Sequence, residues 1–277
     1  MHLPAHVLTQ TALGPRNPFT PVNNPTGRRQ INWDALPATR GVSDDTSSNF
    51  PGEFFNAAVN PRARGALCST PVHTSMMRLS SDPQHTGDGV APLFGQPTEF
   101  SFFSVDPQSA TETQRIIGVT NCKPGSGAAS PGCFLDVHFR DPANPERQAY
   151  VDGFGSVFTG TNVAGLSKIE FFDIDANLLH TVNVPVSGDG MLAFAGAKFA
   201  SPVVAYVRIT AGNLGIDQCS QESATDDCVA MDDFIYGEPK LVQVLAATRA
   251  QFTVESQGQV TIGTGGVLNV GGAPSVA

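Results

Sequence analysis

Hydrophobic and polar residues alternate in short segments along the middle of the chain. In residues 134–140, apolar side chains alternate with Asp136, His138 and Arg140, which predicts a strand with one buried face. Segments of similar character occupy residues 149–159, 167–172, 178–184, 191–199, 203–210 and 229–236. Turn-forming residues separate these segments, and no amphipathic stretch of helical length interrupts them. The pattern predicts an all-β sandwich.

The same pattern divides the chain into three parts. Residues 1–30 are rich in Pro, Asn and Thr and lack periodicity, which is typical of an extended arm. Residues 31–239 carry the strand pattern, and their first strand-like segment is residues 31–34. Residues 240–277 contain no Cys and much Gly, Val and Thr, and their alternation predicts a C-terminal β tail.

The composition supports this organisation. Charged residues make up only 15% of the chain, whereas there are 28 Gly and 21 Pro, which favours short strands joined by many loops. Most of the 18 Phe are expected in the core, because this side chain has no polar group. A formal net charge of −9 argues against a nucleic-acid partner and is compatible with divalent cations.

Four of the five cysteines form two local pairs, Cys122 with Cys133 and Cys219 with Cys228. Each pair brackets a loop rich in Gly, Ser, Pro or Asp, as expected for disulfides that close loops in an oxidising compartment. A zinc site is the weaker alternative, because it requires tighter Cys spacing. Cys68 is left over, either as a buried thiol or as an intermolecular link.

Targeting signals are absent from the sequence as it stands. Residues 1–13 lack the basic and apolar regions of a signal peptide. No stretch approaches the ~18 apolar residues of a membrane helix, so we expect no membrane span. We infer a secreted protein, extracellular or at the cell surface, from the cysteine pattern and from the resemblance described next.

Six short segments form a set: INWD at 31–34, FPGEFFN at 50–56, VDGFGSVF at 151–158, SKIEFFD at 167–173, VRIT at 207–210 and MDDFIYGEP at 231–239. The set resembles a family of secreted bacterial jelly-roll domains and covers residues 31–239. This family is similar in architecture to calcium-containing carbohydrate-binding modules. The resemblance therefore implies a jelly-roll β-sandwich with a structural calcium ion, and it implies no known activity.

Asp232 and Asp233 are adjacent carboxylates in a segment that has the pattern of a strand. Neighbouring residues of a strand point to opposite faces, so one of the two is expected to face inward. A buried carboxylate requires a partner or a metal ion, and calcium prefers carboxylate, amide and carbonyl oxygens. The resemblance places Asp34, Glu53 and Asn56 beside this strand. These five residues form the predicted calcium site, and an exposed acidic edge is the alternative.

Two further acidic segments are weaker candidates. Residues 173–177 resemble the start of an EF-hand loop but lack its Gly and its final Glu, so a hairpin turn is favoured. Asp217, Glu222, Asp226 and Asp227 form an acidic loop that Cys219 and Cys228 close. We expect this loop to be solvated, with a second cation site as the alternative.

No catalytic residues are predicted, and we do not expect an enzyme. The chain contains neither a GxSxG nor an HExxH motif. Asp136 and His138 share a predicted strand face, as half of a proton relay requires, but a polar outer face explains them more simply. A hydrolase that acts on polysaccharides through paired carboxylates is the last of the alternatives.

The C-terminal tail, residues 240–277, follows the last strand that the predicted sandwich requires. A free β edge of low charge is prone to aggregate, so residues 240–277 are expected to have a partner strand. We predict that the tail donates a strand to the next copy of the chain, which gives an open, head-to-tail assembly. The predicted subunit-contact residues are Phe252, Val254, Val260, Ile262, Val267 and Val270. Pairing with its own domain, a second small β unit, and a spacer or surface anchor are the alternatives.

The leading hypothesis is therefore an extracellular structural protein that assembles into a fibre by strand donation and is stabilised by calcium and disulfides. Its partners are copies of itself. The alternative is a secreted, calcium-dependent carbohydrate-binding module with an extracellular glycan as partner. The single Trp and three Tyr argue against a strong lectin-like site, because these side chains are the usual stacking platforms for sugars.

Overall fold

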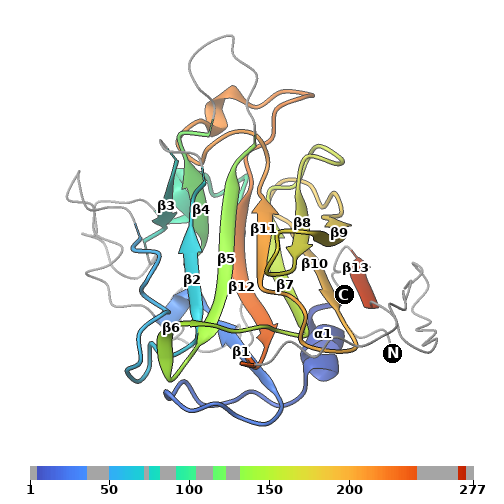
Figure 1. Ribbon diagram of the computed structural model, residues 1–277. Helices are drawn as coiled ribbons and strands as arrows, with labels where there is room; N and C mark the ends of the chain where they lie inside the picture. Colours follow the sequence, from blue (N-terminus) through green and yellow to red (C-terminus); the bar gives the residue numbers. More distant parts are fainter. Residues whose placement is uncertain are drawn as a thin grey trace.

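The protein folds into two antiparallel β-sheets that pack face to face, which confirms the predicted all-β sandwich (Figure 1). The structure is a computed structural model and describes residues 5–35, 50–71, 75–81, 92–103, 115–122, 132–241 and 268–272. Within these residues the named strands pair in antiparallel fashion, and one α-helix, α1 (Ala5–Leu13), lies outside the sandwich.

The first sheet has the strand order β13-β10-β7-β12-β4-β3, and β1 pairs with the C-terminal half of β12. Its strands are β1 (Arg28–Ile31), β3 (Met76–Leu79), β4 (Ile117–Thr120), β7 (Gly153–Thr159), β10 (Leu192–Lys198), β12 (Ala230–Gly237) and β13 (Leu268–Gly272). Because β7 and β12 are buried along their whole length, other parts of the chain cover the outer face of this sheet as well as its inner face.

The second sheet has the order β2-β5-β11-β8-β9, and β6 pairs with β5. Its strands are β2 (Ala66–Ser69), β5 (Phe134–Asp141), β6 (Asn144–Gln148), β8 (Lys168–Phe172), β9 (Leu178–Asn183) and β11 (Tyr206–Thr210). The alternation predicted at residues 134–140 is confirmed, since its apolar side chains are buried in the core. Cys68 on β2 is a buried free thiol. The turn at residues 173–177 joins β8 and β9 in a hairpin, as predicted.

Aromatic rings fill the core where the N-terminal arm meets the sandwich. Trp33 packs edge to face against Phe50, Phe55 and Phe234, with ring centroids 5.1–5.6 Å apart. Trp33 begins the 3₁₀ turn η1 (Trp33–Ala35), so the strand predicted at residues 31–34 ends at Ile31. The turn directs the indole ring into the core.

Both predicted disulfides are present, and the first of them links the two sheets. Cys122 follows β4 of the first sheet and Cys133 precedes β5 of the second, with Cα atoms 5.0 Å apart. Cys219–Cys228 closes the loop between β11 and β12, with Cα atoms 5.1 Å apart. The carbonyl of Gly212, a residue that pairs with Cys228, accepts the Cys133 N–H group at 3.0 Å. Both disulfides therefore lie at the same end of the sandwich.

The opposite end of β12 is closed by a buried ion pair between Arg29 and Glu238. Arg29 donates from Nη2 to Oε1 at 2.7 Å and from Nε to Oε2 at 2.8 Å, and neither side chain is exposed. Asn17 Nδ2 and the Asn24 N–H group also donate to the Glu238 carboxylate, at 2.9 and 3.0 Å. These bonds hold residues 14–27 of the N-terminal arm against the end of the first sheet.

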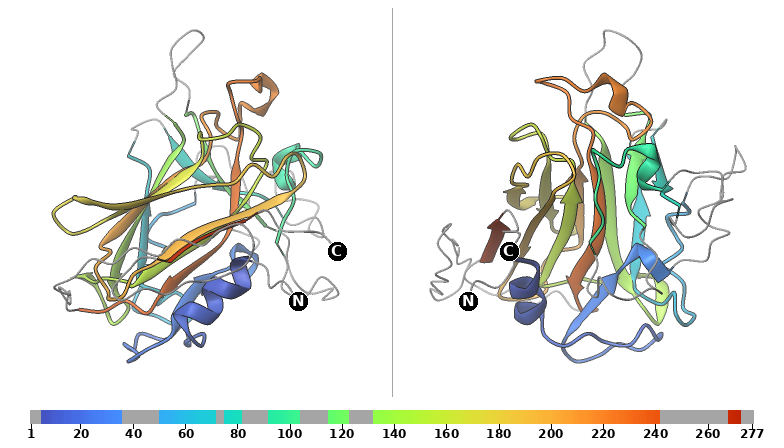
Figure 2. Two further views of the ribbon diagram at one scale, coloured as in Figure 1. Left: turned by 90° about the vertical axis from the view of Figure 1, so that its right-hand side faces the viewer. Right: turned by 180° about the vertical axis from the view of Figure 1, so that it is seen from behind.

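The N-terminal arm differs from the prediction at residues 5–13, which form α1 instead of an extended chain. Figure 2 shows that α1 lies against the outer face of the first sheet, where it contacts β7, β10, β12 and β13. Residues 14–27 of the arm contain no helix or strand, whereas residues 28–30, also assigned to the extended arm, belong to β1, which pairs with β12.

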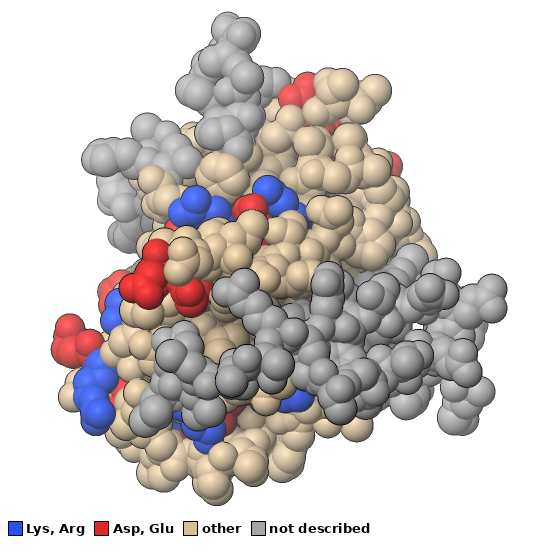
Figure 3. Space-filling view, turned by 45° about the vertical axis from the view of Figure 1, so that its right-hand side comes forward, with Lys and Arg blue, Asp and Glu red and all other residues tan. Residues whose placement is uncertain are grey.

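The described surface carries few charges. On the face shown in Figure 3, most described residues are neither basic nor acidic, in keeping with a charged content of 15%. No helix of the described residues is long and apolar enough to cross a membrane.

Candidate functional site

Asp232 and Asp233 lie at a β-bulge in the middle of β12. The register with β7 pairs Asp232 with Val157 and Phe234 with Ser156, so Asp233 is one additional residue on β12. Both residues are buried, at 1% and 3% exposure, as is every other residue of β12, whose outer face is also covered. The prediction that one of the two faces inward assumes strict alternation, which the bulge interrupts at this point.

The Asp232 carboxylate is held by backbone donors. Its Oδ2 accepts the Phe103 N–H group at 2.7 Å, and its Oδ1 accepts the Asp233 N–H group at 2.7 Å. Burial, and repulsion from the carboxylates of Asp233 and Asp34, raise the pKa of Asp232 well above its usual value. Asp34, Asp232 and Asp233, three of the five predicted calcium ligands, are therefore neighbours. Because their negative charges repel, a bound proton or a bound cation would stabilise this group of carboxylates.

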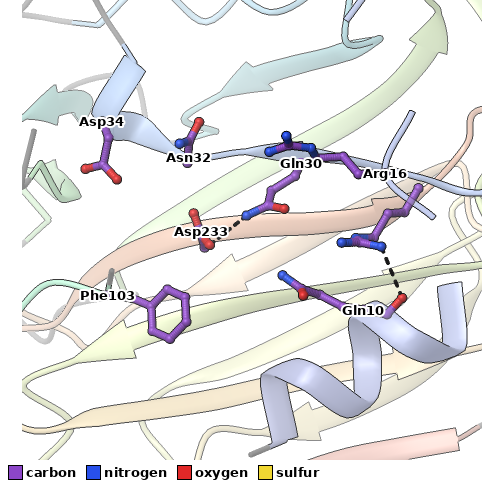
Figure 4. Close-up of a pocket in the computed structure, with 8 residues that line it drawn as sticks. Gln10, Arg16, Gln30, Asn32, Asp34, Phe103 and Asp233 are labelled. Atoms are coloured by element: carbon purple, nitrogen blue, oxygen red, sulfur yellow. Dashed lines mark hydrogen bonds between the residues drawn. The ribbon is translucent and has the colours of Figure 1, made fainter. Parts of the chain in front are cut away.

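Asp34 and Asp233 line a pocket of about 160 Å³ between α1, β1 and β12 (Figure 4). Gln30 Nε2 donates to Asp233 Oδ2 at 2.8 Å across this pocket. The other residues that line the pocket are Gln10, Arg16, Arg28, Asn32 and Phe103. The carboxylates thus share the pocket with amides and with two guanidinium groups.

Glu53 and Asn56 are placed elsewhere. Glu53 is exposed, and Asn56 Nδ2 donates at 3.3 Å to the carbonyl of Pro145 in the β5–β6 hairpin. Within the ranges that the structure describes, no group of three or more His, Cys, Asp or Glu side chains is arranged to hold a metal ion. A calcium ion in the pocket would need amide oxygens from Gln30 or Asn32 beside the carboxylates. Calcium therefore stays a prediction.

A second group of carboxylates joins several loops at the disulfide end. Asn162 Nδ2 donates to Glu99 Oε1 at 3.2 Å and to Asp189 Oδ1 at 2.5 Å, and its backbone N–H group donates to both oxygens of Asp227 at 3.2 Å. The side chain of Glu222 is hydrogen-bonded to Glu99. This contact between two carboxyl groups requires a proton on one of them.

The sequence identified half of this second group. Of the four acidic residues assigned to the loop that Cys219 and Cys228 close, Glu222 and Asp227 belong to it. Asp217 instead accepts the Asn121 N–H group at 3.0 Å, and Asp226 accepts Asn213 Nδ2 at 3.2 Å. The cation site considered for this loop stays untested.

Two pKa values rise in the second group. Burial, the hydrogen bond with Glu222 and the charges of the neighbouring carboxylates raise the pKa of Glu99 to about 8. Burial also raises the pKa of Asp227 to about 6, although backbone donors oppose the shift. At neutral pH, Glu99 is therefore mainly protonated in the folded chain.

The Glu99→Gln variant is expected to be more stable than the unaltered chain at pH 8 and to depend less on pH. The pKa of Glu99 rises from 4.5 to about 8 on folding, so the folded chain keeps a proton that the unfolded chain has released. The resulting stability is fully present below about pH 4.5 and is lost as the pH rises to about 8. Each 1 kcal/mol of unfolding free energy that the variant regains at pH 8 should raise its melting temperature by about 2–4 °C.

Thermal melts of this variant between pH 4 and pH 9 check the prediction. Glu146→Gln removes an exposed carboxylate from β6 and is the matched control, for which we expect no comparable change. If Glu99→Gln has the same pH profile as the unaltered chain, the proposed protonation of Glu99 is wrong.

Three rings stack across the outer face of the second sheet. Phe172 and Tyr206 stack with centroids 4.7 Å apart, and Tyr206 and His138 stack at 4.9 Å. Because the ring faces contact one another, they offer little surface on which a sugar can stack. Asp136 accepts two bonds of 2.7 Å from Arg208, so it pairs with this guanidinium group and not with His138.

The tail contributes β13 to the edge of the first sheet of its own chain (Figure 1). The register runs from Phe194 opposite Gly272 to Lys198 opposite Leu268, and Val270 lies opposite Gly196. The other predicted subunit-contact residues lie outside the described residues; they are Phe252, Val254, Val260, Ile262 and Val267. The structure thus places β13 in its own domain, which was one of the alternatives for the tail.

Comparisons with protein-family models, with curated proteins and with solved structures give no match for this chain. The resemblance to calcium-binding jelly-roll domains therefore rests on the sequence segments alone.

Proposed function

We propose that the chain is an extracellular structural protein whose tail strand β13 is exchanged between copies, so that each copy donates β13 to the β10 edge of the next. The observation that carries this proposal is the pairing of β13 with β10, five residues on each strand. It supports the proposal because the two strands pair in register, as a donor strand and its acceptor edge would.

β10 is suited to exchange its partner strand. Its sequence, LAFAGAK, contains small residues and a single charge at the end, and β13, LNVGG, is uncharged. Without β13, β10 would be an edge strand whose protection is limited to the one charge of Lys198, because it contains no proline and no bulge. The main-chain hydrogen bonds are the same whether β13 comes from the same chain or from another copy.

An extracellular location is supported by the disulfides, because bonds of this kind persist in oxidising compartments. Together with the buried Arg29–Glu238 pair, they close both ends of the sandwich. The sandwich can then stay folded while one edge strand leaves. The glycan-binding alternative is not favoured, since the stacked rings on the second sheet occupy one another's faces.

Electron microscopy of the full-length chain beside a chain that ends at Leu241 tests this proposal. The shorter chain keeps the backbone bonds between Tyr150 and Lys240 and loses β13. We expect filaments from the full-length chain and dispersed particles from the shorter one. A third chain, with residues 268–272 replaced by alternating Gly and Ser, keeps the full length and should also stay dispersed. Filaments from all three chains, or from none, would contradict the proposal.

A further inference from the structure

Helix α1 lies over the strands that the proposed exchange involves. It contacts β10 and β13 as well as β7 and β12, and the views in Figure 2 place it on the outer face of the first sheet. β13 also contacts β9 of the second sheet. β13 is therefore enclosed on three sides: by β10 along its edge, by β9 from the core side and by α1 from the outside.

α1 is attached to the sheet mainly through one face. Thr9 and Leu13 are one turn apart and both are buried, whereas Thr11 between them is exposed. Leu13 packs in an apolar cluster with Val157 on β7, Phe194 on β10 and Ile235 on β12. Among the side chains of α1 that the structure describes, Leu13 is the one that joins this cluster with three strands.

Glycines make room for Leu13. A Cβ atom at Gly153 would lie 3.0 Å from Leu13 Cδ2, and a Cβ atom at Gly155 would lie 2.5 Å from the Phe194 ring. Gly155 and Gly196 lie opposite each other on β7 and β10. Because Gly153 and Gly155 have no side chains, Leu13 and Phe194 can pack directly against the backbone of β7.

α1 has little stability of its own. It has nine residues, and isolated helices shorter than about 12–15 residues are marginal in water. Its C-terminal end is held by Arg28, whose Nη1 donates to the carbonyls of Gln10, at 3.4 Å, and Gly14. Loss of the Leu13 contact should therefore release the helix without disturbing the core of the sandwich.

We propose that α1 is a strap that keeps β13 on β10 of its own chain, and that release of α1 frees both strands for pairing with a second copy. The strap itself follows from the contacts of α1, β13 and Leu13. Only its last step, the pairing with a second copy, rests on the proposed function.

Hydrogen exchange of a Leu13→Asp variant tests the strap. The change introduces a carboxylate into the apolar cluster, so α1 should detach. We expect the amides of Leu268–Gly272, and the β10 amides that bond to them, to exchange about tenfold to a hundredfold faster, as expected for the loss of one buried leucine. The β10 amides that bond to β7 serve as an internal control that the sheet is intact.

Thr11→Asp places the same charge on the exposed side of the helix and is the matched control, with unchanged exchange expected. Leu13→Ala, a milder change, should give a smaller effect in the same amides. Unchanged protection of β13 in Leu13→Asp would overturn the strap.

Electron microscopy of the same variants separates the strap from the proposed function. Faster exchange together with faster filament formation supports both. Faster exchange without filaments supports the strap and contradicts exchange between copies.

Discussion

Replacing Glu238 with alanine is expected to lower the free energy of unfolding by about 3–5 kcal/mol, because it leaves a guanidinium group buried without its counter-ion. Arg29 and Glu238 are both fully buried and share two hydrogen bonds of 2.7 and 2.8 Å. Asn17 and Asn24 would lose their acceptor at the same time. Denaturant titration of the variant with its disulfides intact measures the loss.

Glu170→Ala is the matched control for this change. Glu170 also forms an ion pair, with Lys168 at 2.9 Å, but both side chains are partly exposed on the second sheet. Such a pair contributes about 0–1 kcal/mol, so the control should lose little stability. Equal losses in the two variants would mean that burial of the Arg29–Glu238 pair is not what stabilises this end of the sandwich.

A chain that carries both Ala195→Cys and Gly271→Cys is expected to remain monomeric when oxidised and to form filaments when the new disulfide is reduced. Ala195 and Gly271 lie directly opposite each other on β10 and β13. Paired Cα atoms in an antiparallel ladder are about 4.5–5.5 Å apart, which suits a disulfide. The bond ties β13 to its own β10, so no strand is left to donate.

Cys68 should not compete for the new bond, because it is buried and burial raises the pKa of its thiol to about 12. The double variant Ala195→Ser and Gly271→Ser has polar residues of similar size without the link and should form filaments under both conditions. The unaltered chain, treated with the same reductant, reports any effect of reducing the native disulfides. Filaments from the oxidised cysteine variant would exclude strand exchange as the basis of assembly.

Strands that bury one face could be predicted well from the sequence. Apolar and polar side chains alternate along β5 and β11, because one side of each strand faces the core and the other faces the solvent. This periodicity can be read from a few consecutive residues of the sequence. α1 could not be predicted, because a nine-residue helix depends on the docking of Leu13 onto distant glycines. The turn at Trp33 was also missed, since it is fixed by contacts with Phe50, Phe55 and Phe234.

The polar sites were predicted only in part, for a similar reason. Asp232 and Asp233 could be found as adjacent carboxylates, but the bulge between β12 and β7, and the cover over the outer face of β12, depend on distant parts of the chain. Glu99 and Asp189 could not be assigned to the loop between the last two cysteines, because Asn162 brings them together from different loops. Contacts between residues far apart in the sequence leave no local pattern.

The most direct test of strand exchange is to mix two copies, one with only Ala195→Cys and the other with only Gly271→Cys, under oxidising conditions. Neither copy can form the new bond within itself. If β13 of one copy pairs with β10 of another, non-reducing electrophoresis should show a disulfide-linked dimer of the two chains. If the chains stay unlinked in the mixture while the double-cysteine chain forms its internal bond, β13 does not leave its own domain, and the assembly proposed here does not occur.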